Sequence, residues 1–278
     1  MMMYPESSEV IKIHEHGKLQ LLSVMGSDSS ICDAARISYG TGTKTVNDDR
    51  NLIRYLMRNR HTSPFEMGEC LFYIKMPIFV MRQWIRHRTA NVNEYSGRYS
   101  EMSNEFYIPY GDYVQAQSQS NNQGREGVLS ELLQNNFSSR CVSSSLNSYD
   151  NYKMNLEEGY SRELSRIILP VSNYTECYWK IDLHNLFHFL KLRMDHHAQR
   201  EIRDYANAMF GMVKEKFPLA TEAFEDYVLN SVTLSREEYD IIRNALDEHW
   251  LEKSHKEELE ESNLSKREKN EFIERWIE

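Results

Sequence analysis

The segment "ECLFYIKMPIFVMRQWIRHR", residues 69–88, determines how we expect this chain to fold. Residues 69–76 form a nearly unbroken apolar run of strand length, which predicts a buried β-strand. Pro77 suits the first position of a helix, because its φ is fixed near the helical value and it has no N–H to leave unbonded. We therefore expect a helix over residues 78–88. Its buried stripe would hold Ile78, Met81 and Ile85, and its other side would hold Arg82, Gln83 and Arg86.

Apolar residues at regular spacing predict further elements on both sides of this segment. Upstream, we expect a strand over residues 19–24, a short helix over residues 30–38 and a second helix over residues 50–61. Ser29 and Ser30 resemble an N-cap for the short helix. Downstream, we expect a helix over residues 182–193 and another from an Asp195 cap to just before Pro218. The first of these would bury Leu183, Phe187 and Leu190.

Two segments differ from the rest in composition. Residues 111–150 are rich in Ser, Asn and Gln, which predicts a long loop or insertion around a possible short helix. Residues 235–278 are highly charged and helical in propensity, with a weak apolar stripe made of Ile241, Ile242, Leu246, Trp250 and Leu251. We therefore expect a main domain over residues 1–234 and a helical tail over residues 235–278, packed against that domain or a partner subunit.

The charge balance limits the classes of ligand. The chain of 278 residues has 33 basic and 42 acidic residues, a net charge of −9, which argues against a general nucleic-acid or membrane-surface binder. An anionic ligand would need cations concentrated locally. The four cysteines show no C-x-x-C pair or zinc spacing, so we expect free thiols in a reducing cytosol. The first residues do not resemble a signal peptide, and the apolar run at 71–81 is too short to span a membrane. We expect a cytoplasmic protein.

Such a local concentration of cations occurs in "RHRTANVNEYSGRYS", residues 86–100. If this segment is extended, Glu94, Ser96 and Arg98 point to one side, and a guanidinium beside a hydroxyl suits a phosphate. Gly97 would let the backbone approach a ligand closely. Nearby aromatic rings could stack on a nucleotide base: Trp84, Tyr95, Tyr99, Phe106, Tyr107 and Tyr110. The alternative is a solvated arginine face, which is common for R-H-R alone.

Ser96 and the histidines leave alternatives open. A nucleophilic serine needs a base within reach, and the neighbouring arginines stay protonated, so we interpret Ser96 as a ligand donor. His184, His188, His196 and His197 could suggest a metal, but they lack the H-E-x-x-H pattern, and we favour a site without a metal. His61 could be structural or catalytic on this evidence.

At this point the sequence resembles a known family. R-H-R followed by seven residues and then Ser96 is the motif of the flavin-dependent thymidylate synthases. "DAARISYG", "HTSPFE", "PIFVMRQWIRHR", "SRELSRIILP" and "LHNLFHFLKLRMDHHAQREI" are similar to family segments and follow the family order. The resemblance covers roughly residues 16–230. It implies an α+β catalytic domain, an antiparallel sheet flanked by helices, and a homotetramer whose active sites are shared between subunits.

The resemblance also implies the reaction and its residues. FAD would take hydride from NADPH, and methylenetetrahydrofolate would give its one-carbon unit to C5 of dUMP, yielding dTMP and tetrahydrofolate. Arg193 would be catalytic, activating the uracil ring. The dUMP-binding set would be Gln83, Trp84, Ile85, Arg86, Glu94, Tyr95, Ser96, Gly97, Arg98, Arg166 and Arg193. The FAD-binding set would be Ser30, Ser63, Arg86, His87, Arg88, Glu94, Asp182, Leu183, His184 and His188. His61 would lie near the flavin and folate.

The sequence departs from the family pattern at a few positions. Asn91 stands where serine is frequent, and Asp182-Leu183-His184 and His188 replace residues that contact flavin in some members. Because a carboxylate next to a pyrophosphate is unfavourable, we expect Asp182 to cap the following helix instead. Three alternatives stay open: a flavoenzyme that modifies dUMP differently, for example by hydroxymethylation; a module that binds single-stranded nucleic acid; and a helical interaction protein built on the tail.

Overall fold

The computed structural model describes residues 9–38, 48–120, 122–245 and 254–276. The chain divides into two compact units, residues 1–224 and 225–278. The predicted boundary at residues 234 and 235, between a main domain and a tail, stays a prediction. Each unit is described by itself below.

A five-stranded antiparallel sheet forms the centre of the first unit, with the strand order β1-β2-β3-β7-β4. Its strands are β1 (Val10–Ile13), β2 (Gly17–Met25), β3 (Glu69–Pro77), β4 (Asn91–Glu94) and β7 (Tyr174–Asp182). The expected strands near residues 19–24 and 69–76 are confirmed as β2 and β3. Strand β7 pairs with both β3 and β4 and brings Trp179 opposite Phe72. The predicted α+β class with an antiparallel sheet is confirmed.

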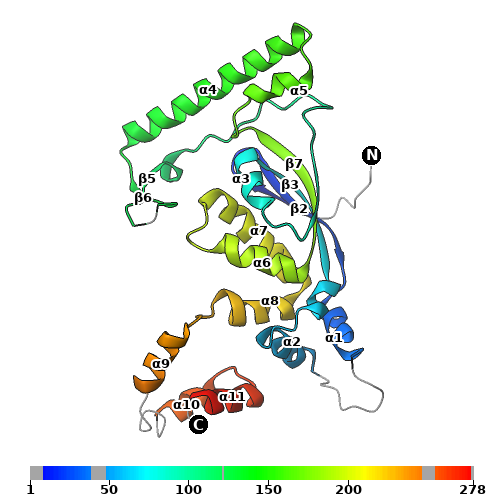
Figure 1. Cartoon of the computed structure of the whole chain (residues 1–278), viewed down its shortest axis with the longest axis vertical. Helices are drawn as coiled ribbons and strands as arrows, with labels where there is room; N and C mark the ends of the chain where they lie inside the picture. Colours follow the sequence, from blue (N-terminus) through cyan, green and yellow to red (C-terminus); the bar gives the residue numbers. More distant parts are fainter. Residues whose placement is uncertain (1–8, 39–47, 121, 246–253, 277–278) are drawn as a thin grey trace. The chain divides into compact units, whose positions relative to one another are not determined.

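Helices pack around this sheet (Figure 1). They are α1 (Asp28–Arg36), α2 (Asp49–Arg58), η1 (Ser63–Met67), α3 (Ile78–Trp84), α6 (Leu183–Met194), α7 (Arg200–Lys216) and α8 (Pro218–Phe224). Helix α7 contacts α6, α3 and strands β1 and β2. The helices expected near residues 30–38, 50–61 and 182–193 are confirmed as α1, α2 and α6. Leu183, Phe187 and Leu190 are buried, as predicted.

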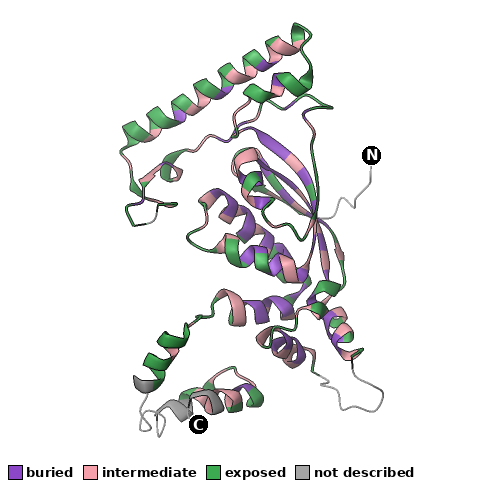
Figure 2. Cartoon of the chain, in the orientation of Figure 1, coloured by how far each residue is buried: buried purple, intermediate pink, exposed green. Residues whose placement is uncertain are grey.

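The core between sheet and helices is aromatic (purple in Figure 2). Trp84 is fully buried, with its ring centroid 4.4 Å from that of Phe189 and 5.2 Å from that of Trp179. This contact corrects the predicted orientation of α3. The buried residues are Val80, Met81 and Trp84, and Ile85 is 49% exposed, because inserting the large indole rotates the helix away from the expected stripe. The helix also ends at Trp84, and residues 85–88 lie beyond it.

Helix α7 begins later than expected. The sequence predicted a start next to Asp195, but α7 starts at Arg200. The Asp195 carboxylate accepts hydrogen bonds from the backbone N–H and from Nδ1 of His197, 2.8 and 2.9 Å away. A side chain that caps a local turn competes with helix formation, so residues 195–199 form a separate connection between α6 and α7. The end before Pro218 is confirmed.

Residues 111–150 were expected to be a long loop or insertion around a possible short helix, and the expectation of a loop was wrong. This region forms η2 (Gly111–Tyr113), a hairpin of β5 (Gln115–Gln117) and β6 (Arg125–Val128), and the 27-residue helix α4 (Glu131–Glu157). The buried residues of α4 are Ser138, Ser145 and Tyr152, which follow one another at intervals of seven positions. Ser138 Oγ donates to the Pro109 carbonyl at 2.6 Å, and Tyr152 OH accepts from the Met102 N–H at 3.0 Å. Because the buried side of α4 carries small or polar residues, the sequence has no apolar periodicity that would predict this helix.

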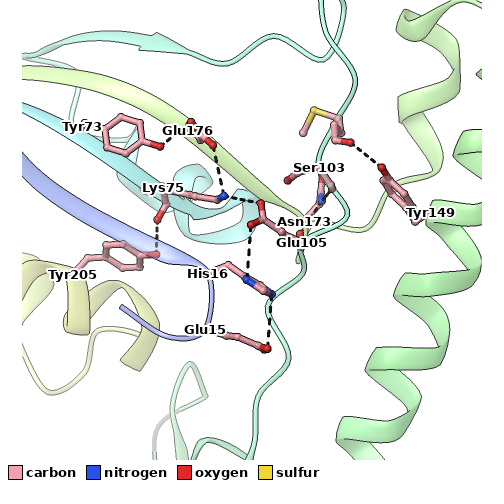
Figure 3. Close-up of polar contacts among 11 residues, drawn as sticks. Glu15, His16, Tyr73, Lys75, Ser103, Glu105, Tyr149, Asn173, Glu176 and Tyr205 are labelled. Atoms are coloured by element: carbon pink, nitrogen blue, oxygen red, sulfur yellow. Dashed lines mark hydrogen bonds and ion pairs between the residues drawn. The ribbon is translucent and has the colours of Figure 1, made fainter. Parts of the chain in front are cut away.

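An ion network around the buried Lys75 ties Glu105 to the sheet (Figure 3). Lys75 on β3 is 7% exposed, and its Nζ lies 2.6 Å from Glu105 and 3.6 Å from Glu176 on β7. Tyr73 OH donates to the other oxygen of Glu176 at 2.8 Å, and Tyr205 OH on α7 donates to the Lys75 carbonyl at 2.7 Å. Since a buried lysine needs charged partners, this network holds Glu105, in the segment that follows β4, against β3 and β7.

The second unit is helical, as the tail prediction required. It contains the π-helical turn η4 (Glu225–Leu229), α9 (Arg236–Ala245), α10 (Ser254–Glu261) and α11 (Lys266–Trp276). Ile241 is 68% exposed and Ile242 39%. The other residues of the expected apolar stripe, Leu246, Trp250 and Leu251, lie outside the described residues. Across both units, no described helix has the length and apolar character that crossing a bilayer requires.

Candidate active site

The most constrained cation among the predicted site residues is Arg193, in the last turn of α6. Its Nε donates to Nε2 of His87 at 3.0 Å, and its Nη2 donates to the backbone carbonyl of Gln83 at 3.3 Å. Burial lowers the pKa of Arg193, but a guanidinium keeps its proton in proteins. Gln83 lies at the C-terminal end of α3, where its carbonyl accepts from the Arg86 N–H at 3.4 Å and also from Arg193. The structure thus brings the catalytic candidate onto the end of α3.

His87 is neutral at physiological pH. Burial, followed by the charge of Arg193 and by His188, lowers the pKa of His87 to about 4. Its ring packs edge-on against Phe189, with the centroids 4.9 Å apart, and lies 5.8 Å from the ring of His188. Since Nε2 accepts from Arg193, the ring proton is on Nδ1.

Gln199 joins this group without having been predicted. Gln83 Nε2 donates to Gln199 Oε1 at 2.5 Å, so the side chain of Gln83 is held from the connection before α7. No spacing relates these two residues in the sequence, since they are 116 positions apart. We call Gln83, His87, Arg193 and Gln199 the arginine cluster.

A second group of predicted residues lies after β4. The strand ends at Glu94, whose Oε1 accepts from Thr175 Oγ1 at 2.8 Å. The extended arrangement expected through Arg98 was therefore wrong. Ser96 begins a turn instead: its carbonyl accepts from the N–H groups of Tyr99 and Ser100, and its Oγ accepts from the Arg98 N–H at 3.3 Å. Local hydrogen bonds of a serine side chain favour such a turn over a strand.

Arg166 lies against this turn. A Cβ placed on Gly97 would come within 2.8 Å of Met102 Sδ and 3.2 Å of Arg166 Cδ, so the close approach needs a glycine. Arg98 Nε pairs with Glu163 Oε2 at 2.8 Å, with both side chains more than half exposed. We call Ser96, Gly97, Arg98 and Arg166 the serine turn.

Three arginines of the predicted sets have no internal partner. Within the described ranges, the side chains of Arg86, Arg88 and Arg166 make no hydrogen bond or ion pair. The same chain carries nine more acidic than basic residues, so carboxylates are in excess and yet do not pair with these cations. Exposed guanidinium groups left unpaired beside a hydroxyl suit an anionic ligand such as a phosphate.

The residues expected to contact FAD lie on neighbouring elements. Helix α1 packs against η1, and η1 packs against α6, so Ser30, Ser63 and His184 belong to adjoining elements. His184 is half-buried and His188 exposed, four positions apart on one face of α6. These side chains offer hydrogen-bond donors, and Arg86 and Arg88 offer positive charge. Such a donor set fits a dinucleotide with a pyrophosphate.

Some residues of the predicted sets have side chains that are buried or already hydrogen-bonded within the chain. Trp84 and Leu183 are fully buried, and the Leu183 N–H already donates to the Gly68 carbonyl. Asp182 caps α6, accepting from the Asn185 N–H at 2.9 Å and from Asn185 Nδ2 at 2.8 Å, as expected.

Of the aromatic rings expected to stack on a base, Phe106 and Tyr107 are also buried, which leaves Tyr95, Tyr99 and Tyr110 as exposed rings. His61 is exposed, and its ring lies 5.7 Å from that of Tyr55.

A small cavity and a ligand-type cluster lie beside these groups. A cavity of about 170 Å³ is lined by residues that include Ile85, His87, Arg88 and Val92. It is smaller than the roughly 300 Å³ at which small-molecule sites usually begin. Asp195, His196 and His197 are exposed and place one ligand atom each within 4.8 Å of one another, so they could hold a divalent cation. The expectation of a site without a metal stays a prediction.

Comparison with known proteins identifies the family of the chain. A family model described as "Thymidylate synthase complementing protein" matches residues 20–219. A flavin-dependent thymidylate synthase of Dictyostelium discoideum is 52% identical over 259 residues, covering 90% of this chain and 85% of the relative. One of Ruegeria pomeroyi is 50% identical over 266 residues, covering 93% and 85%. The structure is similar to a UMP/dUMP methylase, PolB, of Streptomyces cacaoi bound with 5-Br dUMP, with a TM-score of 0.70, 30% identity, and coverage of 78% and 98%. The resemblance drawn from the motifs is therefore confirmed, and the chain belongs to the flavin-dependent thymidylate synthase family.

Proposed function

We propose that this protein is a thymidylate synthase that reductively methylates dUMP to dTMP. In this proposal methylenetetrahydrofolate donates the carbon, and FAD reduced by NADPH donates the hydride. The observation that carries the proposal is the anchored guanidinium of Arg193. It has five N–H groups, of which two are used by His87 and Gln83. Three remain to face a substrate from a fixed position.

Arg193 would act on the uracil ring. Attack at the pyrimidine draws negative charge onto its carbonyls and N3. A guanidinium held beside those atoms stabilises the charge without giving up its own proton. Partial burial strengthens that interaction, because the local dielectric is lower than in water. FAD, when bound, supplies the hydride. The side chains of Ser30, Ser63, His184 and His188 would donate hydrogen bonds to FAD, and Arg86 and Arg88 would lie at its phosphates.

The serine turn would hold the phosphate of dUMP. Ser96 Oγ can donate to a phosphate oxygen, while Arg98 and Arg166 supply charge on either side of Gly97. Among the described residues no histidine, lysine or carboxylate hydrogen-bonds to Ser96 Oγ, so the side chain has no base to make it a nucleophile. Gln83, Ile85, Glu94 and Tyr95 would complete the contacts.

We also propose a homotetramer with shared active sites. Six of the predicted dUMP residues lie in the arginine cluster or the serine turn, and no hydrogen bond or ion pair connects these two groups within the described part of the chain. A second copy could bring one group against the other. Large apolar side chains exposed along α4, α5 (Arg162–Ser165) and η3 (Arg166–Ile168) support association, because such surfaces are rare on monomers. They are Leu132, Leu133, Phe137, Leu146, Met154, Leu164, Ile167 and Ile168.

Release of tritium from dUMP labelled at C5 tests the reaction. We expect release that requires FAD, NADPH and methylenetetrahydrofolate together, with dTMP as the product. Folded, flavin-containing protein without release would contradict the proposal, and release with a product other than dTMP would favour a different modification of dUMP at C5. The same assay with UMP measures selectivity for the deoxyribose, since the structural relative PolB is described as acting on both nucleotides. Salt-sensitive oligonucleotide binding without flavin would favour a nucleic-acid module.

A further inference from the structure

We infer that His87 is a positioning residue for Arg193, and that its ring nitrogen sets the direction in which the arginine presents its free N–H groups. This inference rests on the proposed function, in which Arg193 activates the substrate. Sequence reasoning placed His87 only among the FAD contacts. The structure gives it a different partner, 106 positions away in the chain, at 3.0 Å.

The donor geometry of Arg193 carries the argument. A guanidinium has two edges that can each present a pair of parallel N–H groups. The edge formed by Nε and Nη2 is occupied, since Nε donates to His87 and Nη2 to the Gln83 carbonyl. The other edge, formed by Nη1 and the second hydrogen of Nη2, is left for a ligand. Two acceptors on one edge fix both the position and the plane of the group.

The acceptor on His87 is available because the ring is neutral. If Nε2 carried a proton, it would face the Nε–H of Arg193 and two donors would meet. Packing against Phe189 and burial beside the guanidinium keep the ring in the neutral form. The ring is also held from the side, so Nε2 stays aimed at Arg193. Only Nδ1 is left for a flavin contact.

Loss of this acceptor should affect turnover more than binding. The Gln83 carbonyl would still hold Nη2, so Arg193 would stay nearby but could rotate about that single hydrogen bond. A displacement of about 1 Å in a catalytic group can lower the rate roughly 100-fold. The dUMP phosphate, held at the serine turn in the proposal, would be unaffected. We therefore expect kcat to fall while the KM for dUMP changes little.

Two substitutions separate the acceptor from the ring. His87→Gln can place its amide oxygen near the position of Nε2, whereas the shorter His87→Asn reaches only as far as Nδ1. We expect His87→Gln to keep kcat within about 5-fold of wild type, and His87→Asn to lower it about 30- to 100-fold. FAD content, measured by visible absorbance, should be equal in both. Lys191→Gln, at an exposed position of α6 outside the predicted site, is the matched control and should leave kcat unchanged.

A double-mutant cycle tests whether His87 acts through Arg193. Lysine lacks the Nε–H, so in an Arg193→Lys background the His87→Asn substitution should lower kcat by less than about 2-fold. Equal losses in both backgrounds would overturn the inference, as would equal activity of the Gln and Asn variants. A loss of kcat that only follows loss of FAD would also overturn it. Crystal structures of the wild type and His87→Asn test the contact without an activity measurement, and an Arg193 that keeps its position in the variant contradicts the inference. A wild type without turnover contradicts only the proposed function.

Discussion

Acidification should destabilise the native protein through His87, and a glutamine at this position should remove that part of the pH dependence. His87 has a pKa of about 4 in the native state, against 6.5 for an ordinary histidine. Between these values the unfolded chain binds a proton that the folded chain does not. The free energy of unfolding therefore falls as the pH is lowered through this window, and it is fully retained above pH 6.5.

The size of the effect follows from the pKa difference. At about pH 5 the unfolded histidine is almost fully protonated and the native one is not. The free energy of unfolding lost by that pH corresponds to about 1.5 pH units below the ordinary pKa, or about 2 kcal/mol. His87 is partly exposed, and solvent reduces the real effect. We therefore expect His87 to account for about 1 kcal/mol of the stability lost between about pH 7.5 and pH 5.

Urea unfolding at the two pH values measures this loss. Wild type, His87→Gln and the exposed-site control Lys191→Gln are compared without FAD at one protomer concentration, because association changes apparent stability. Carboxylates titrate equally in all three proteins, so their contribution cancels in the comparison. The wild type and the control should each lose about 1 kcal/mol more than His87→Gln. Equal losses in all three proteins would refute the assignment of a neutral, buried His87.

Three further predictions concern catalysis and stability. Arg193→Ala should lower kcat roughly 100- to 1,000-fold with an unchanged Tm, and near-normal turnover would remove the role given to this residue. Ser96→Ala should keep kcat within about 10-fold of wild type, because the hydroxyl only donates to the ligand; complete loss with intact dUMP binding would indicate a nucleophile. Glu222→Gln should lower the free energy of unfolding by about 2 kcal/mol in urea titrations, because Arg54, 3% exposed, loses a carboxylate 3.0 Å away; a change under about 0.5 kcal/mol would contradict this.

The sequence predicted those elements whose residues follow a clear apolar period. Strand β3 and helices α1, α2 and α6 bury one side, and a hydrophobic period shows such elements directly. Helix α4 has serines and a tyrosine on its buried side, and its stability comes from contacts such as Ser138 with Pro109, far apart in the chain. Local composition therefore indicated a loop. The rotation of α3 likewise depends on Trp84 packing against Trp179, a residue on a distant strand.

The candidate site was predictable in its residue types but not in its hydrogen bonds. The motif identified Arg193, Arg166 and the residues around Ser96. It could not show that His87 accepts from Arg193, because α3 and α6 meet only in the folded chain. It also could not show that the side chain of Gln199 holds that of Gln83.

The different pairing of the arginines explains how an acidic protein can bind an anionic substrate. Arg86, Arg88 and Arg166 have no carboxylate partner among the described residues, so an arriving phosphate need not displace one. Arg98 does pair with Glu163, but an exposed ion pair contributes about 0–1 kcal/mol and can be exchanged for a phosphate at little cost. Arg193 is held instead by a neutral ring and a carbonyl. Neutral acceptors fix its orientation and leave its charge uncompensated, which is the condition for stabilising negative charge on a bound uracil ring.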